Sequence, residues 1–547
     1  MKPSGSLPVG VADLAATDVG PGVDRFAARL FYPCQRSWTL PCTWIPHINY
    51  ARGYIGYVFK MVAKKDWKTE LARSALISAA WALGGSRVLP VYYNAPVATP
   101  AAAPGPLPVL IFSHGLAGTR NAYSSICIEM ASRGYLVMAL EHSDGSASCA
   151  RLPRRPTAAA AAAATSPASA DCDVRPILST SDGQEVGSKG RSSVADAVSN
   201  VGLPAAASAP APAPSGGGSN WYFYCGLGDK PEQLRKTRHR VAEVAAAYLL
   251  LAQLNGGLLS GGGGGGSSGG GGRTAAIREL PAAVANSLRG RLDLERAAVA
   301  GHSYGGATAA AAAASLPYFK AAVSLDPWWD CFDDSWPVLN RWVNPTRPPL
   351  LVIGSDDWNT PNAKGMLKCG GVNQERVLAA AAAGGGGAVL VVPRGSTHTN
   401  FDDVMLLFGK SLSALLRLLN IRTSLEPRLA HRINMWCITH FLSKHLPPPP
   451  PSSPSSLSQQ LSQPNNEDSK GEDAAGHRTG AAAAAEAEAA GSSSIPSPSP
   501  SPAAVAEATG AAARTTAAQH IQEGDIDSYR ETVGEWLSIL RVAPGRL

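Results

Sequence analysis

The chain has 547 residues, and its formal net charge of +7 is spread without any dense basic run. That distribution argues against a nucleic-acid-binding surface. Tracts rich in Ala, Gly, Ser and Pro near residues 145–220, 256–275 and 446–520 cannot bury enough apolar surface to order themselves, so we expect disorder there. What remains, roughly 370 residues, suits one large domain better than two.

The cysteines and the N-terminal residues indicate in which cellular compartment the protein is expected. The nine cysteines are scattered and form no C-x-x-C pair, which favours free thiols in a reducing compartment over a disulfide framework or a zinc site. The first 20 residues carry no secretory signal, and no run of 18 apolar residues occurs. We therefore expect a cytoplasmic protein, and we expect neither a metal nor an organic cofactor.

Short apolar runs alternate with helical spacing along the chain. The runs predict strands at residues 107–112, 135–140, 297–300, 321–325, 350–353 and 389–392, and the spacing predicts helices at 121–133, 232–254 and 308–314. This alternation predicts an α/β fold with a mostly parallel sheet flanked by helices and interrupted by low-complexity insertions. In such a sheet, functional residues lie at the carboxyl ends of the strands.

The strongest chemical motif is the G-x-S-x-G of residues 301–305, between a predicted strand and a helix of small residues. In that context the motif is a nucleophile elbow, in which the glycines allow a sharp turn that exposes the serine hydroxyl. Such a pentapeptide also arises by chance in chains rich in Gly and Ser. Its place between strand and helix favours the functional interpretation, with Ser303 as the nucleophile.

A serine hydroxyl needs an imidazole to accept its proton, and in this fold the histidine comes later in the chain. His398 follows the strand predicted at 389–392, whereas the other histidines after Ser303 lie in a C-terminal helical region or in low-complexity sequence. A lone histidine is otherwise a surface or capping residue. Its position makes His398 the candidate general base.

An acyl-transfer intermediate also needs N–H donors for its oxyanion. One is expected from the residue after the nucleophile and one from the loop after an early strand. Tyr304 and Leu116 occupy those two places. A simple turn is the alternative interpretation of the loop at 114–116.

Several segments together resemble the platelet-activating factor acetylhydrolases, phospholipases of the α/β-hydrolase fold that remove short or oxidised sn-2 acyl groups without calcium. The matching segments are FSHGL at 112–116, ASRGY at 131–135, GHSYGGAT at 301–308, LDPW at 325–328 and GSTHTNF at 395–401. RLFYP at 29–33 and WIP at 44–46 are also similar to that family. Departures are the insertions, an Ala/Gly tract at 379–388, and Pro327 where the family pattern has alanine.

The resemblance implies Asp326 as the acid of a catalytic triad with Ser303 and His398. Strand order alone favours a different choice, because in many α/β-hydrolases the acid follows the penultimate strand, here Asp356 or Asp357. The alternative for that pair is an exposed loop or a helix cap. Asp326 is preferred, since one helix and one strand separate it from Ser303.

These observations predict an α/β-hydrolase domain over 25–445, after an N-terminal extension (1–24) and before a disordered linker (446–520) and a C-terminal tail (521–547). The expected activity is calcium-independent hydrolysis of phospholipid sn-2 esters, that of a 1-alkyl-2-acetylglycerophosphocholine esterase. The alternatives are another carboxylesterase or lipase of the same fold, or a catalytically silent scaffold. Apolar stripes with Lys or Arg at 54–83 and 405–419 suggest peripheral membrane contact, or else packing on the core.

Overall fold

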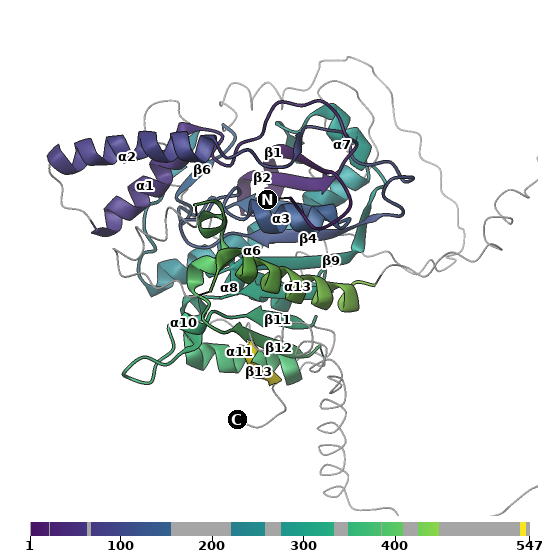
Figure 1. The fold of residues 1–547 in the computed structure, drawn as a ribbon. Coiled ribbons are helices and arrows are strands. Elements are labelled where there is room, and N and C mark those ends of the chain that lie inside the picture. Colours follow the sequence, from purple (N-terminus) through teal and green to yellow (C-terminus); the bar gives the residue numbers. More distant parts are fainter. Residues whose placement is uncertain are drawn as a thin grey trace, which may run out of the picture. The chain divides into compact units, whose positions relative to one another are not determined.

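One large β-sheet organises the computed structural model, which describes residues 2–20, 22–62, 67–154, 220–257, 275–332, 348–383, 386–408, 425–447 and 537–542. Its strands run in the order β13-β12-β11-β10-β9-β4-β5-β2-β1-β3, with β8 beside β1 (Figure 1). They are β1 (Val9–Gly20), β2 (Val23–Pro33), β3 (Tyr92–Tyr93), β4 (Leu107–Ser113), β5 (Leu136–Glu141), β8 (Ala276–Ile277), β9 (Leu292–His302), β10 (Ala321–Leu325), β11 (Leu350–Ile353), β12 (Ala388–Pro393) and β13 (Leu537–Val542). A separate antiparallel pair joins β6 (Cys149–Arg151) to β7 (Trp221–Phe223).

The centre of the sheet is parallel. Strands β5, β4, β9, β10, β11 and β12 pair in that order, each parallel to the next. Antiparallel strands flank them, β2 against β5 on one side and β13 against β12 on the other. The carboxyl ends of the parallel strands therefore meet along a single edge, and the loops that leave this edge carry the candidate site.

Helices cover both faces of the sheet. Alternate side chains of β4 show the division, because Val109 and Ile111 join one apolar cluster whereas Leu110 and Phe112 join the other. The first cluster includes residues of α6 (Lys230–Asn255), α7 (Ala282–Leu288), α8 (Tyr304–Ser315) and α11 (Gly371–Ala383). The second includes residues of α1 (Ile48–Val62), α3 (Ser124–Ser132) and α13 (Pro427–His445). The predicted sheet, mostly parallel and covered on both faces, is confirmed.

Both edges of the sheet contain strands outside the range predicted for the domain. Residues 9–20, expected within an N-terminal extension, form β1, which pairs antiparallel with β2. Nine of the 12 residues of β1 are buried, so the strand lacks the alternation of apolar and polar residues that marks a half-exposed strand. Residues 537–542 of the expected tail form β13 on the opposite side.

The structure describes the two apolar segments with Lys or Arg to different extents. Residues 54–83 form parts of two helices, α1 and α2 (Trp67–Gly85), which pack on each other and project together from one side of the sheet (Figure 1). Of the segment 405–419, the structure describes only residues 405–408. The Ala/Gly tract at 379–388, expected in a loop, begins as the last turns of α11, as the high helix propensity of alanine favours. The low-complexity tracts at 155–219, 258–274 and 448–536 lie outside the described residues.

A buried ion pair joins β1 to β2. The Arg29 guanidinium donates to both carboxylate oxygens of Asp13, at 2.7 and 3.0 Å, and Arg120 lies 3.5 Å from the same carboxylate. Burial by itself would raise the pKa of Asp13, but the guanidiniums of Arg120 and Arg29 outweigh it and hold that pKa well below its usual range. The carboxylate therefore stays ionised in the folded chain and stabilises it at neutral pH.

Replacing Asp13 by Asn should lower the free energy of unfolding by about 3 kcal/mol at pH 7, because it leaves the buried Arg29 guanidinium without the carboxylate that pairs with it. Urea denaturation of Asp13→Asn and of the wild type measures the difference. Since the folded pKa is depressed, the difference should shrink as the pH falls below about 4. The matched control is Glu70→Gln, which removes the exposed pair with Arg73 and should change stability by less than about 1 kcal/mol. Equal effects of the two substitutions would contradict the prediction.

Candidate active site

The turn from β9 into α8 places Ser303 at the carboxyl edge of the sheet. Ser303 has φ 55° and ψ −120°, a conformation that non-glycine residues rarely adopt. The flanking glycines make this turn possible. A Cβ added to Gly301 would lie 2.2 Å from the Gly305 carbonyl oxygen, and one added to Gly305 would lie 2.0 Å from that of Ser113. The predicted strand–elbow–helix arrangement is therefore what the chain forms.

The loop after β4 lies directly against this elbow. A Cβ added to Gly115 would lie 3.1 Å from the Ser303 Cβ, so the neighbouring Leu116 is beside the serine. Tyr304 is the first residue of α8, where a backbone N–H has no acceptor within its own helix. Both predicted oxyanion donors thus belong to segments that meet at Ser303.

Tyr123 ties the loop to the elbow. Its hydroxyl accepts a hydrogen bond from the Gly115 N–H at 3.1 Å and shares another with Nδ1 of His302 at 2.8 Å. His302 is buried, and burial together with the nearby His398 holds its pKa well below the usual value. The imidazole next to the nucleophile therefore stays neutral, and it leaves His398 as the ring available to receive a proton.

The structure brings His398 and Asp326 together. Nδ1 of His398 lies 2.6 Å from Oδ2 of Asp326, which follows β10, whereas His398 begins a short 3-10 helix, η2 (His398–Phe401), after β12. Asp326 is fully buried and the His398 side chain is 26% exposed. One side of the imidazole is thus fixed by a carboxylate that water does not reach, while the ring remains open to an incoming molecule.

Two residues that the sequence analysis did not identify complete the surroundings of His398. Ser355 donates to Asp326 through its N–H and its hydroxyl, both at 2.6 Å. Its hydroxyl oxygen also accepts from the N–H of Trp358, capping α10 (Asp356–Asn359). The Trp358 ring stacks on the His398 imidazole at 3.7 Å between centroids and 6° between planes. A stacked indole favours a positively charged ring, so it would stabilise the imidazolium that forms during acyl transfer.

The alternative acids make other contacts. Asp356 accepts a hydrogen bond from the Gly395 N–H at 2.8 Å, and Asp357 pairs with Lys368 on the surface at 2.6 Å. Both belong to the first turn of α10, at the helix N-terminus where the helix-cap interpretation placed them, but the cap itself is Ser355. Ser355 could have been identified from the sequence as a helix cap, because a serine just before two aspartates is typical of a helix N-terminus.

The arrangement is suited to acyl transfer through a serine. The Ser303 hydroxyl makes no hydrogen bond with any described residue, and such contacts in ligand-free enzymes are often long and tighten when substrate binds.

Within the described ranges, no three His, Cys, Asp or Glu side chains gather as a metal site. No helix there has both the length and the apolar character to cross a bilayer.

Comparisons with known proteins show which families and structures this chain is similar to. The profile of the family described as platelet-activating factor acetylhydrolase, isoform II, matches residues 1–166 and 276–448. The platelet-activating factor acetylhydrolase of Canis lupus familiaris is 25% identical over 456 residues, covering 81% of this chain and 77% of its own. A bis(hydroxyethyl) terephthalate hydrolase of Streptomyces coelicolor is 42% identical over 71 residues, covering 13% of this chain and 20% of its own. A ferulic acid esterase from Streptomyces cinnamoneus superimposes with a TM-score of 0.48 at 16% identity, covering 83% of this chain and 96% of its own.

Replacing Asp326 by Asn should lower turnover of p-nitrophenyl acetate by about 10⁴-fold, the loss typical when the acid of such a triad no longer fixes the histidine tautomer. Asp357→Asn is the matched control, because it removes a carboxylate near the same edge that contacts Lys368 instead of His398, and its turnover should stay within a few-fold of wild type. An active Asp326→Asn enzyme beside an inactive Asp357→Asn enzyme would reverse the assignment.

Proposed function

The chain belongs to the platelet-activating factor acetylhydrolase family, isoform II, and from that premise we propose that it hydrolyses phospholipids carrying a short or oxidised sn-2 acyl group, without calcium. At the coarser level, the family and the esterases among its relatives make it a carboxylic ester hydrolase of the α/β-hydrolase fold. The observation that carries ester hydrolysis is the hydrogen-bonded pair of Asp326 and His398 beside the elbow serine. The family match supports a phospholipid as the substrate. A 1-alkyl-2-acetylglycerophosphocholine is the expected substrate.

In the proposed cycle, His398 removes the proton of Ser303 as the hydroxyl attacks the sn-2 carbonyl carbon. Asp326 holds the imidazole with Nε2 toward the serine and stabilises its positive charge. The tetrahedral intermediate then collapses, the lysophospholipid leaves with the proton from His398, and the acyl group remains on Ser303. Water, activated by the same histidine, hydrolyses the acyl-enzyme and releases the short acid.

The backbone N–H groups of Leu116 and Tyr304 would stabilise the oxyanion of both tetrahedral intermediates. Donors fixed before the reaction need no reorganisation as charge develops, and removing one such donor from a serine enzyme costs about 10²–10³ in kcat. Polarisation of the carbonyl by these N–H groups is what makes calcium unnecessary in the proposed mechanism.

A second candidate function is hydrolysis of soluble or polyester-type esters. It is favoured by the local similarity to the bis(hydroxyethyl) terephthalate hydrolase, which is limited to 71 residues. The family match covers far more of the chain and therefore favours the phospholipid. A silent scaffold is the least favoured alternative, because the three polar side chains of the site are intact.

A panel of substrates separates these candidates. The purified chain should hydrolyse 1-alkyl-2-acetylglycerophosphocholine in the presence of EDTA, with much lower activity on a phosphatidylcholine with two long acyl chains, and Ser303→Ala should lose at least about 99% of the activity. Turnover of bis(hydroxyethyl) terephthalate alone would favour the second candidate. Failure of the wild type to react with a fluorophosphonate probe would favour the silent scaffold.

We further propose that the enzyme is cytoplasmic and meets lipid surfaces through α1 and α2. The described cysteines are free thiols, which suits a reducing compartment. Exposed apolar side chains gather on α2, including Leu71 at 66%, Trp81 at 45% and Leu83 at 56% exposure. The hydroxyl of Tyr54 on α1 is 2.7 Å from that of Thr119, in the loop that also contains Leu116. A lipid surface on these helices would therefore lie close to the site.

Vesicle flotation tests this proposal. Ser303→Ala protein, which cannot consume the lipid, should float with phosphatidylcholine vesicles, and the additional change of Leu71 and Leu83 to Asp should abolish flotation because it places charges in the apolar surface. The control is Val372→Asp, at an equally exposed apolar position on α11, which should float like the parent. No association with neutral or phosphatidylserine-containing vesicles would overturn the proposal.

A further inference from the structure

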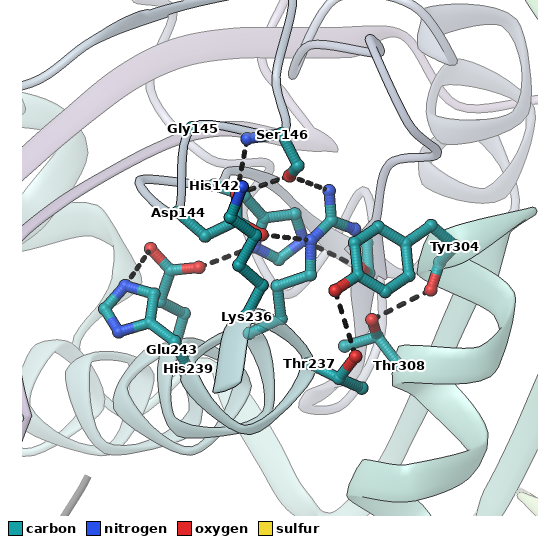
Figure 2. Close-up of polar contacts among 12 residues, drawn as sticks. His142, Asp144, Gly145, Ser146, Lys236, Thr237, His239, Glu243, Tyr304 and Thr308 are labelled. Atoms are coloured by element: carbon teal, nitrogen blue, oxygen red, sulfur yellow. Dashed lines mark hydrogen bonds and ion pairs between the residues drawn. The ribbon is translucent and has the colours of Figure 1, made fainter. Parts of the chain in front are cut away.

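Helix α6 turns a buried polar face toward the segments that carry the two proposed oxyanion donors. Asp144, Ser146 and Tyr304 gather beside Thr237 of this helix, with His239 and Glu243 further along it (Figure 2). Asp144 and Ser146 follow β5, and Tyr304 begins α8, so the cluster draws on three parts of the fold. At its centre lies Arg240, which is completely buried.

The Arg240 guanidinium contacts both sides of the proposed oxyanion hole. Nη1 donates to the His114 carbonyl oxygen at 2.8 Å, two residues before Leu116. The guanidinium carbon lies 4.2 Å from the centroid of the Tyr304 ring, within the range of a cation–π contact. The Arg240 side chain thus contacts the loop that supplies the Leu116 N–H and the residue that supplies the Tyr304 N–H.

The remaining donors of Arg240 hold the segment that supports the loop from behind. Nε donates to Oδ2 of Asp144 at 3.0 Å, and Nη2 donates to the Ser146 hydroxyl. The carbonyl oxygen of Ser146 in turn accepts from the N–H of Ala117 at 2.8 Å. Ala117 follows Leu116 directly and has φ 57°, so its unusual backbone conformation is held by this bond.

The charges of this cluster persist in the folded chain. Burial would raise the pKa of Asp144, but the Arg240 guanidinium lowers it to about 2. Buried ion pairs contribute little net stability, because desolvation offsets their attraction, and well-packed apolar residues often replace them without loss. What a guanidinium adds that an apolar side chain cannot is a set of donors in a fixed plane. Here the donors reach two different segments, and the face of the guanidinium lies over the Tyr304 ring of a third.

A second buried chain of hydrogen bonds braces the start of the same loop. Ser113 Oγ lies 2.7 Å from Nε2 of His142, whose Nδ1 lies 2.6 Å from Glu243. These are the residue types and distances of a catalytic triad. All three are at most 2% exposed, however, so no substrate reaches them, and the His142 N–H also donates to Nε2 of His114. Because these three residues are buried and contact the start of the loop at 113–118, they support that loop.

We propose that Arg240 is a positioning residue for the oxyanion hole, holding the backbone N–H groups of Leu116 and Tyr304 at the spacing that the tetrahedral intermediate requires. It acts through His114, Ser146 and the Tyr304 ring and touches no reacting atom. The proposal rests on the site assignment of the proposed function and does not depend on which ester is the natural substrate.

The test compares full-length Arg240→Lys and Ser146→Ala with the wild type. Arg240→Lys keeps the charge beside Asp144 but cannot contact three segments at once. Ser146→Ala removes the hydroxyl that links Arg240 to Asp144 and leaves every buried charge in place. Each should lower kcat for p-nitrophenyl acetate, Arg240→Lys by roughly 10²-fold, with KM within about three-fold of wild type. Affinity for a trifluoromethyl ketone, which forms an oxyanion on Ser303, should fall in proportion to kcat/KM.

The matched control is Lys236→Met, which removes another buried cation one turn earlier on α6. Lys236 donates to the Gly226 carbonyl and pairs with Glu232, neither of which belongs to the oxyanion loop. We therefore expect kcat to stay within about three-fold even if the melting temperature falls as much as in Arg240→Lys. The proposal is overturned if both site variants keep kcat and ketone affinity within three-fold of wild type. If Arg240→Lys fails to fold, Ser146→Ala alone decides. Undiminished activity of Ser303→Ala would instead refute the site assignment itself.

Discussion

The active-site architecture depends on the close approach of two backbone segments, the end of β4 and the start of α8. An added Cβ at Gly305 would lie 2.0 Å from the Ser113 carbonyl oxygen, and the neighbour is backbone that cannot rotate away. Because the segments touch, the loop after β4 and the first N–H groups of α8 face the same small volume in front of Ser303. The glycines at 301 and 305 are therefore requirements of space as well as of turn geometry.

Parallel strands explain why the other two polar residues meet at this place. Strands β10 and β12 end at the same edge as β9, so the residues that follow them start within reach of the nucleophile. The sheet does not orient the side chains, and that part of the arrangement depends on Ser355 and Trp358. Ser355 fixes the Asp326 carboxylate with two donors, and Trp358 fixes the plane of the imidazole. A residue held by packing and by hydrogen bonds on several sides keeps its geometry through a reaction cycle.

The central strands and the elbow were predictable because each is encoded locally. Strands β4, β10, β11 and β12 coincide with the apolar runs to within about a residue at each end, since turn residues interrupt the sequence there. The sequence analysis did not predict β1, because small and apolar residues on both of its faces conceal the two-residue alternation of a strand. It did not predict β13, because a long low-complexity tract separates that strand from the others. The contact between Asp326 and His398 followed from a family resemblance, and strand order alone favoured Asp356 or Asp357.

The polar face of α6 shows why part of the site was beyond sequence reasoning. The apolar spacing that predicts this helix corresponds to buried residues such as Val241 and Leu251. Arg240 and Glu243 are not singled out by the sequence, because charged residues on a helix are usually solvated. Two serine–histidine–carboxylate chains exist in this fold, at Ser303 and at Ser113, with similar hydrogen-bond distances to the carboxylate. Ser113 is hydrogen-bonded to His142 at 2.7 Å, whereas the Ser303 hydroxyl has no hydrogen bond with a described residue. Residue type and the distance from histidine to carboxylate do not distinguish the two chains. Access does, since His398 is partly exposed whereas His142 is completely enclosed. The enclosed chain keeps its polar groups satisfied in a low-dielectric interior, where each bond is stronger and an unpaired group is costly. These buried hydrogen bonds make the structure rigid directly behind the loop of Leu116. An oxyanion hole that is formed before the substrate arrives requires such a rigid support.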